Sequence, residues 1–138
     1  MPLLLRKYMK NNHFKAESFF KSQGYARNGI KLIFRNERNF RIDIFIAVLV
    51  IIAGFLFKIS HYDWIALSLV ISMVFMSEVI NSAIEALCDT VSQDFKINIK
   101  YAKDVSAGAV LVSAFVSVVT GLIVFLPYLI DFAKNFLL

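Results

Sequence analysis

The side chains best suited to chemistry lie together at residues 78–89 (EVINSAIEALCD). Glu78 interrupts a long uncharged stretch, and Asn81, Ser82, Glu85 and Asp89 follow it after three, four, seven and eleven positions. At about 100° per residue, these positions share one face of an α-helix, with about 10 Å along the axis between Glu78 and Glu85. The spacing therefore predicts a helix with one acidic stripe.

Two other places in the chain bring charge next to an apolar run. Glu37 stands among three arginines just before the first run, and Lys103 and Asp104 stand just before the last. Carboxylates are hard oxygen ligands of the kind that Mg²⁺ prefers, and Lys or Arg side chains can hold phosphate. If the three places meet at one level, they predict a site for a metal ion and a phosphate group.

Other readings of the acidic stripe stay open on this pattern. An acidic side chain at the centre of a membrane helix costs about 2.5–3.5 kcal/mol on insertion scales, so it usually serves a function. The stripe could instead pair with basic residues to hold helices together in a non-enzymatic membrane oligomer. It could also conduct ions or protons through Glu78 and Glu85.

The elements that would carry these residues are membrane spans. Hydrophobic residues make up 59% of the 138 residues, and the mean hydropathy is +0.68. A soluble fold of this length could not bury that much apolar surface. Charge-free runs at residues 44–57, 64–77 and 105–130 predict three spans, at about residues 42–57, 64–88 and 105–130. A tight link at residues 58–63 and a polar loop at about residues 90–100 would join them.

Residues 14–36 mix apolar and basic side chains at roughly helical spacing. That mixture predicts an amphipathic helix on the membrane surface, ahead of the first span. The expected fold is an all-α membrane protein of three transmembrane helices plus this surface helix, with residues 1–138 as one domain.

The distribution of charge predicts the orientation of the chain. Of the 15 Lys and Arg residues, ten lie between Arg6 and Arg41, and three more lie between Lys96 and Lys103. Basic residues beside spans mark the cytoplasmic side, so the N-terminus and the acidic stripe are expected there. No module for stacking bases accompanies the net charge of +5, so nucleic acid is not an expected partner.

Several familiar chemistries have no support in the sequence. There is no GxxxxGK[ST] loop, and the five glycines do not cluster as in a phosphate-binding loop. His13 and His61 are far apart and are expected on opposite sides of the membrane. The one cysteine, Cys88, excludes an internal disulfide and a cysteine-based metal cluster.

Residues 78–89, followed by residues 103–109 (KDVSAGA), resemble the signature of the small bacterial diacylglycerol kinase and undecaprenol kinase family. The resemblance extends to residues 24–43 (GYARNGIKLIFRNERNFRID) and covers nearly the whole chain after about residue 18. It implies a homotrimer whose sites form between neighbouring subunits. It also implies transfer of the γ-phosphoryl group of MgATP to a lipid hydroxyl, with Mg²⁺ as cofactor.

The resemblance also implies roles for individual residues. Glu78 would be the catalytic base, with Asn81 and Lys103 also catalytic, and Glu37 and Glu85 would hold the metal ions. Glu78 and Ala107 would contact the lipid. The residues implied to bind ATP are Tyr25, Glu37, Glu85, Asp94, Phe95, Lys96, Lys103 and Asp104.

The chain departs from the proteobacterial enzymes of this family in two places. A nucleotide-contacting arginine of those enzymes falls near Ser18 here, so that contact is not expected. Residues 37–42 (ERNFRI) look more like the undecaprenol kinase branch. Undecaprenol is therefore the expected substrate, and diacylglycerol, which would give phosphatidic acid, is the alternative.

Overall fold

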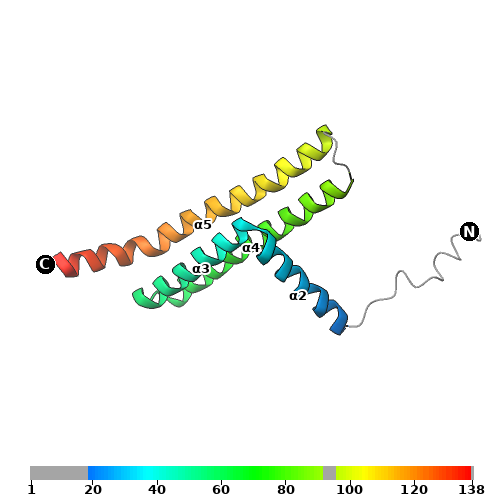
Figure 1. Ribbon diagram of the computed structural model, residues 1–138. Coiled ribbons are helices and arrows are strands. Elements are labelled where there is room, and N and C mark those ends of the chain that lie inside the picture. Colours follow the sequence, from blue (N-terminus) through cyan, green and yellow to red (C-terminus); the bar gives the residue numbers. More distant parts are fainter. Residues whose placement is uncertain (1–18, 92–95, 138) are drawn as a thin grey trace, which may run out of the picture. The chain divides into compact units, whose positions relative to one another are not determined.

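The computed structural model describes residues 19–91 and 96–137, and all regular secondary structure in this part of the chain is helical (Figure 1). Its helices are α2 (Phe19–Asn36), α3 (Arg38–Phe57), α4 (His61–Val91) and α5 (Ile97–Leu137). The expected all-α fold is confirmed. The chain divides into two compact units, residues 1–32 and 33–138, which are described separately.

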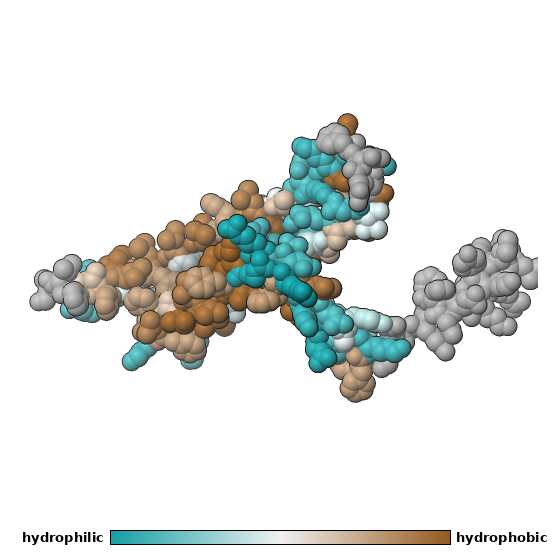
Figure 2. Space-filling model, viewed as in Figure 1, coloured by the Kyte–Doolittle hydropathy of each residue, from teal (hydrophilic) through white to brown (hydrophobic). Residues whose placement is uncertain are grey.

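Helices α3, α4 and α5 are long and apolar enough to cross a membrane, over Arg38–Phe57, His61–Val91 and Ile97–Asn135. Apolar side chains cover most of their surface in Figure 2, and hydrophilic ones gather where α4 ends and α5 begins. The prediction of three spans is confirmed at the level of length and composition. The three helices are longer than the charge-free runs, because charged residues at the ends of each run also belong to the helix.

The polar loop predicted at about residues 90–100 is the clearest difference. Thr90 and Val91 belong to α4, and α5 already begins at Ile97. The Thr90 hydroxyl is accommodated within the helix, where it donates a 2.8 Å hydrogen bond to the carbonyl of Ala86 one turn earlier. The predicted loop is therefore too long on both sides.

Helix α2 has no buried residue, and Phe19, Phe20 and Ile30 are among its exposed apolar side chains. The helix predicted at residues 14–36 is thus present over Phe19–Asn36, and its first residues fall outside the described part. Its placement on a membrane surface stays a prediction.

The junction between α2 and α3 is held by an arginine. Glu37 is extended (φ −93°, ψ 116°) and interrupts the helix, while its N–H still donates to the carbonyl of Ile33 at 2.8 Å. The Arg41 guanidinium donates to the carbonyls of Phe34 and Arg35, at 3.1 and 3.0 Å. A cation on these terminal carbonyls stabilises the end of a helix, so Arg41 fixes the backbone that carries Glu37.

The hairpin between α3 and α4 is closed tightly at the opposite end of the bundle. Lys58 ends α3 in the left-handed conformation (φ 52°), and the N–H of Ile59 donates back to Gly54 at 3.2 Å. Ser60 and Asp63 then cap α4 reciprocally: the Ser60 N–H donates to Asp63 Oδ2 at 3.1 Å, and the Asp63 N–H donates to Ser60 Oγ at 3.3 Å. Such a capping box satisfies amide groups that a helix start leaves without partners.

Helix α5 packs along α4 for most of its length, and α3 also packs on α4. Near the hairpin, Ile59 of the link, Leu67 of α4 and Val124 of α5 form a buried cluster, and Val50 and Phe57 of α3 pack against it. Farther along, Ser77 of α4 and Ser113 of α5 share a hydrogen bond of 2.7 Å. Polar side chains that bond between helices are a common means of holding membrane helices together.

Candidate active site

Glu78 lies in the middle of α4 and is buried, with 6% of its surface exposed. The carboxylates of Asp43 on α3, Glu37 at the α2–α3 junction and Glu85 on α4 all lie within electrostatic range of it. Two segments that are distant in sequence, residues 37–43 and 78–85, therefore bring carboxylates near one another. The predicted acidic stripe of α4 is the centre of this cluster.

Asn81 connects the acidic stripe to α5. Its Nδ2 donates a 2.9 Å hydrogen bond to Glu85 Oε1 one turn farther along α4. Its Oδ1 accepts a 2.7 Å hydrogen bond from the hydroxyl of Ser106 on α5. Both groups of the amide are thus used, and they hold Glu85 in a defined position.

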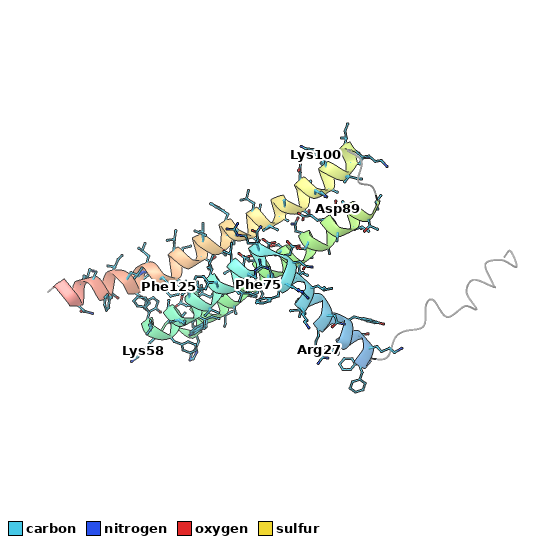
Figure 3. All side chains as sticks on the ribbon, in the orientation of Figure 1. Arg27, Lys58, Phe75, Asp89, Lys100 and Phe125 are labelled. Atoms are coloured by element: carbon cyan, nitrogen blue, oxygen red, sulfur yellow. The ribbon has the colours of Figure 1, made fainter. Side chains whose placement is uncertain are left out.

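Lys103 reaches the same end of the bundle from the start of α5. Its Nζ lies 2.5 Å from Asp89 Oδ1, and the charge of Glu85 also acts on it. Asp104 pairs instead with Lys100, at 3.1 Å, on the exposed side of α5. Asp89 and Lys100 lie at this end of the helix pair in Figure 3, whereas Lys58 marks the other end.

Asp43 was not among the predicted site residues, and the structure brings its carboxylate within electrostatic range of Glu78. Its Oδ2 is buried and has no hydrogen-bond partner within residues 19–91 and 96–137. A buried carboxylate oxygen without a partner is costly, so its retention calls for a reason. The one available signal was that Asp43 lies six residues after Glu37, inside the resembling segment.

An apolar groove of about 270 Å³ begins at Asp43 and runs between α3, α4 and α5. Small residues leave the space on one side: Ala47 on α3, and Ala114, Ser117 and Gly121 on α5. The volume is just below the range of about 300–1,000 Å³ that small-molecule pockets occupy, so it suits part of an apolar ligand.

The donors present suit Mg²⁺ in type. Glu37 and Glu85 offer carboxylate oxygens, and Mg²⁺ is commonly bound through one or two carboxylates together with substrate phosphates. Within the described residues, no three His, Cys, Asp or Glu side chains are gathered closely enough to hold an ion by themselves. A metal held at Glu37 and Glu85 would therefore need oxygens from the nucleotide.

The remaining predicted residues are less informative about the site. Tyr25 is exposed on α2, in the other compact unit. Lys96 is exposed just ahead of α5, and Ala107 is exposed beside Ser106. Asp94 and Phe95, like Ser18, lie outside the described residues. Ser106 is the functional candidate that sequence reasoning missed, since nothing in its type or spacing sets it apart from other serines.

Comparison with known proteins identifies the family of this chain. The profile of the family described as prokaryotic diacylglycerol kinase matches residues 24–125. That match includes Glu37, Glu78, Glu85 and Lys103. The chain belongs to this family, and the expectation of an ATP-dependent lipid kinase is confirmed at that level.

Individual relatives carry two different names. The chain is 39% identical to the undecaprenol kinase of Bacillus subtilis (strain 168) over 120 residues, which cover 87% of this chain and 98% of the relative. It is 37% identical to a diacylglycerol kinase of Synechocystis sp. over 123 residues, covering 88% of this chain and 70% of the relative. It is 28% identical to the diacylglycerol kinase of Escherichia coli (strain K12) over 112 residues, covering 81% of this chain and 92% of the relative.

Proposed function

We propose that this protein transfers the γ-phosphoryl group of MgATP to the hydroxyl of a membrane lipid alcohol, with undecaprenol preferred to diacylglycerol. The observation that carries the proposal is the burial of Glu78 among the charges of Asp43, Glu37 and Glu85, at helices that can span a membrane. Carboxylates at that depth could bind metal ions and accept a proton at the level where nucleotide phosphates meet the hydroxyl of a lipid.

Phosphoryl transfer relies on positioning and on neutralising charge, and it needs little covalent participation from the protein. The lipid oxygen forms a bond to the γ-phosphorus, the bond from that phosphorus to the bridging oxygen of ADP breaks, and Glu78 accepts the hydroxyl proton. The products are a lipid phosphate and ADP. No phosphorylated form of the enzyme is required.

The neighbours of Glu78 have supporting roles in this mechanism. Mg²⁺, when bound at Glu37 and Glu85, would neutralise charge on the nucleotide phosphates. Lys103 would leave Asp89 to contact a phosphate oxygen, which is a change of ionic partner between exposed groups and costs little. Tyr25, residues 94–96 and Asp104 complete the proposed nucleotide site, and Ala107 is proposed beside the lipid.

The apolar groove supports a lipid as the second substrate. It opens at Asp43, whose charge acts on Glu78, and it is lined almost entirely by apolar side chains. A lipid chain in the groove would hold its hydroxyl end near the acidic cluster. The B. subtilis relative and the ERNFRI segment favour undecaprenol, while the relatives named diacylglycerol kinase keep that lipid as the alternative.

The proposal includes an assembly and an orientation. In this proposal, three copies of the chain assemble and share their sites. Helix α2 lies on the membrane surface, and the N-terminus and the active site face the cytoplasm of a bacterial cell. The concentration of Lys and Arg between Arg6 and Arg41 supports that orientation. A site shared with a neighbouring copy would also supply metal and nucleotide contacts that one chain lacks.

Transfer of radiolabelled γ-phosphate from MgATP to undecaprenol and to diacylglycerol, each in mixed micelles, tests the proposal. Undecaprenol should be labelled faster, and Glu78→Gln should lose at least 100-fold in turnover while keeping its oligomeric state. Asp131→Asn, the same kind of change on an exposed residue near the end of α5, should retain full activity. Absence of label on both lipids from folded protein would favour a non-enzymatic oligomer, and flux across liposomes would favour an ion or proton pathway.

A further inference from the structure

A buried serine on α5 stands behind the metal-binding end of α4. Ser106 is 7% exposed, and its hydroxyl lies 2.7 Å from Asn81 Oδ1 and 2.9 Å from the carbonyl of Lys103. Asn81 in turn donates to Glu85 at 2.9 Å. A continuous path of hydrogen bonds therefore leads from the interior of the helix pair to a carboxylate of the acidic cluster.

The direction of each hydrogen bond in this path follows from the chemistry of its ends. A carboxylate accepts hydrogen bonds only, so Asn81 must turn its NH₂ group toward Glu85. The amide oxygen then faces Ser106, and it needs a donor there. The Ser106 hydroxyl supplies one, and it also reaches the Lys103 carbonyl on its own helix.

Loss of the Ser106 hydroxyl would remove the constraint on Asn81. The amide could then rotate, and the hydrogen bond that holds Glu85 would be made only part of the time. Partners of this kind, which orient a metal ligand without touching the ion, commonly change metal affinity by about 10–100-fold when they are removed.

We propose that Ser106 is a positioning residue for Glu85, acting through Asn81, and that it sets the affinity of the site for its divalent cation. The proposal rests on the proposed function, because it takes Glu85 as a ligand of the metal bound with the nucleotide. Ser106 touches neither substrate nor ion in this scheme. Its effect would be on binding of the metal and, through that, on turnover at low metal concentration.

The structure provides a matched control in Ser113. This serine is also 7% exposed, lies on the same helix, and bonds across to α4 at 2.7 Å, but its partner is Ser77 rather than a residue of the acidic cluster. Ser106→Ala and Ser113→Ala each remove one hydroxyl from the contact between α4 and α5. A purely structural role would give both variants the same behaviour.

The experiment measures the Mg²⁺ concentration for half-maximal activity at saturating ATP, and separately the binding of Mn²⁺ by electron paramagnetic resonance with a non-hydrolysable ATP analogue. Ser106→Ala should raise the half-maximal Mg²⁺ concentration and the dissociation constant for Mn²⁺ by about tenfold each, with little change in turnover at saturating Mg²⁺. Ser113→Ala should match the native protein in both. Ser106→Thr, which keeps the hydroxyl, should recover most of the affinity.

An unchanged metal dependence in Ser106→Ala, or an equal shift in Ser113→Ala, would overturn the proposal. The Mn²⁺ measurement needs no turnover, so it separates this inference from the proposed function. If the native protein binds Mn²⁺ with nucleotide but labels no lipid, the kinase proposal fails and the role of Ser106 is still decided. The thermal unfolding temperatures of the two alanine variants should be lowered by similar amounts. That result would verify that the change in metal affinity of Ser106→Ala is not caused by a loss of folding.

Discussion

Tyr128 on α5 donates a hydrogen bond of 2.8 Å to Oδ2 of Asp63 at the start of α4. The Ser60 N–H donates to the same tyrosine oxygen at 3.1 Å. One side chain of the last helix thus holds the cap that joins the first two spans. This contact lies at the end of the bundle opposite Asp89 and Lys103.

Tyr128→Phe should therefore destabilise the fold without impairing the chemistry. Removing a hydroxyl that donates to a carboxylate should lower the free energy of unfolding by about 2 kcal/mol, with the KM values for ATP and lipid unchanged. Thermal unfolding in detergent, paired with steady-state kinetics, measures both. Tyr62→Phe is the control, since Tyr62 is 84% exposed in the same hairpin. An equal loss of stability in both variants would contradict the role given to the contact.

Lys103→Met should raise the KM for ATP by about 10–100-fold, because the proposed hydrogen bond to a phosphate is charge-assisted. Asp89→Asn should leave that KM unchanged or lower it by no more than about fivefold, since it releases Lys103 from a solvent-exposed ion pair of small net stability. Lys100→Met, which removes the other ion pair at the start of α5, is the control. A raised KM in Asp89→Asn would mean that the Lys103 pair serves structure rather than nucleotide binding.

Asp43→Leu should stabilise the protein while reducing turnover. The substitution removes a buried oxygen without a partner beside an apolar groove, which should raise the free energy of unfolding by about 1–2 kcal/mol. It also removes one of the carboxylates within electrostatic range of Glu78, so turnover should fall at least tenfold. The free energy of unfolding and the turnover, both measured on one preparation with Asp131→Asn as control, test the prediction. A variant that is stabilised and fully active would exclude Asp43 from the site.

Ala114→Leu should fill part of the groove and raise the KM for a long-chain lipid alcohol by about fivefold or more, with the KM for ATP unchanged. A water-soluble short-chain alcohol should be affected less, because it occupies less of the groove. Ala109→Leu is the matched control, as Ala109 is exposed on the same helix and does not line the groove. If Ala114→Leu changes the oligomeric state and neither KM, the groove is a packing surface between protein copies.

Gly54→Ala should be one of the most damaging single methyl additions in the bundle. A Cβ at this position would lie 2.7 Å from the Trp64 ring, and overpacking of this kind typically costs about 1–3 kcal/mol. Gly121→Ala, on α5, meets nothing within 4 Å and should cost far less. The comparison of their thermal unfolding curves in detergent is the measurement. Similar stabilities would show that Trp64 can move aside at little cost.

Local periodicity explains what the sequence could predict. Glu78, Asn81 and Glu85 were placed on one face because spacing along a single helix determines which residues share a side. The charge-free runs likewise predicted α3, α4 and α5 because membrane spans need long apolar segments. These inferences require no knowledge of how one helix is rotated against another.

Contacts between helices could not be predicted in the same way. The sequence did not indicate that the hydroxyl of Tyr128 bonds to Asp63, and it did not distinguish Ser106 from the other serines. The small residues Ser113, Ser117 and Gly121 recur every four positions on α5, yet Ser113 packs on α4 while the other two line the groove. Helix rotation and crossing decide such partners, and neither is encoded in a single-helix pattern.

Lys58 offers a way to engineer a more robust protein. An L-residue in the left-handed conformation costs about 1–2 kcal/mol, and glycine avoids that cost. Lys58→Gly would therefore relieve strain at the hairpin, far along the bundle from Glu78. Such a background would tolerate weakened variants of the acidic cluster that would otherwise be lost during purification. Lys58, the one non-glycine residue with a positive φ among residues 19–91 and 96–137, thus becomes a practical starting point for dissecting the chemistry of the protein.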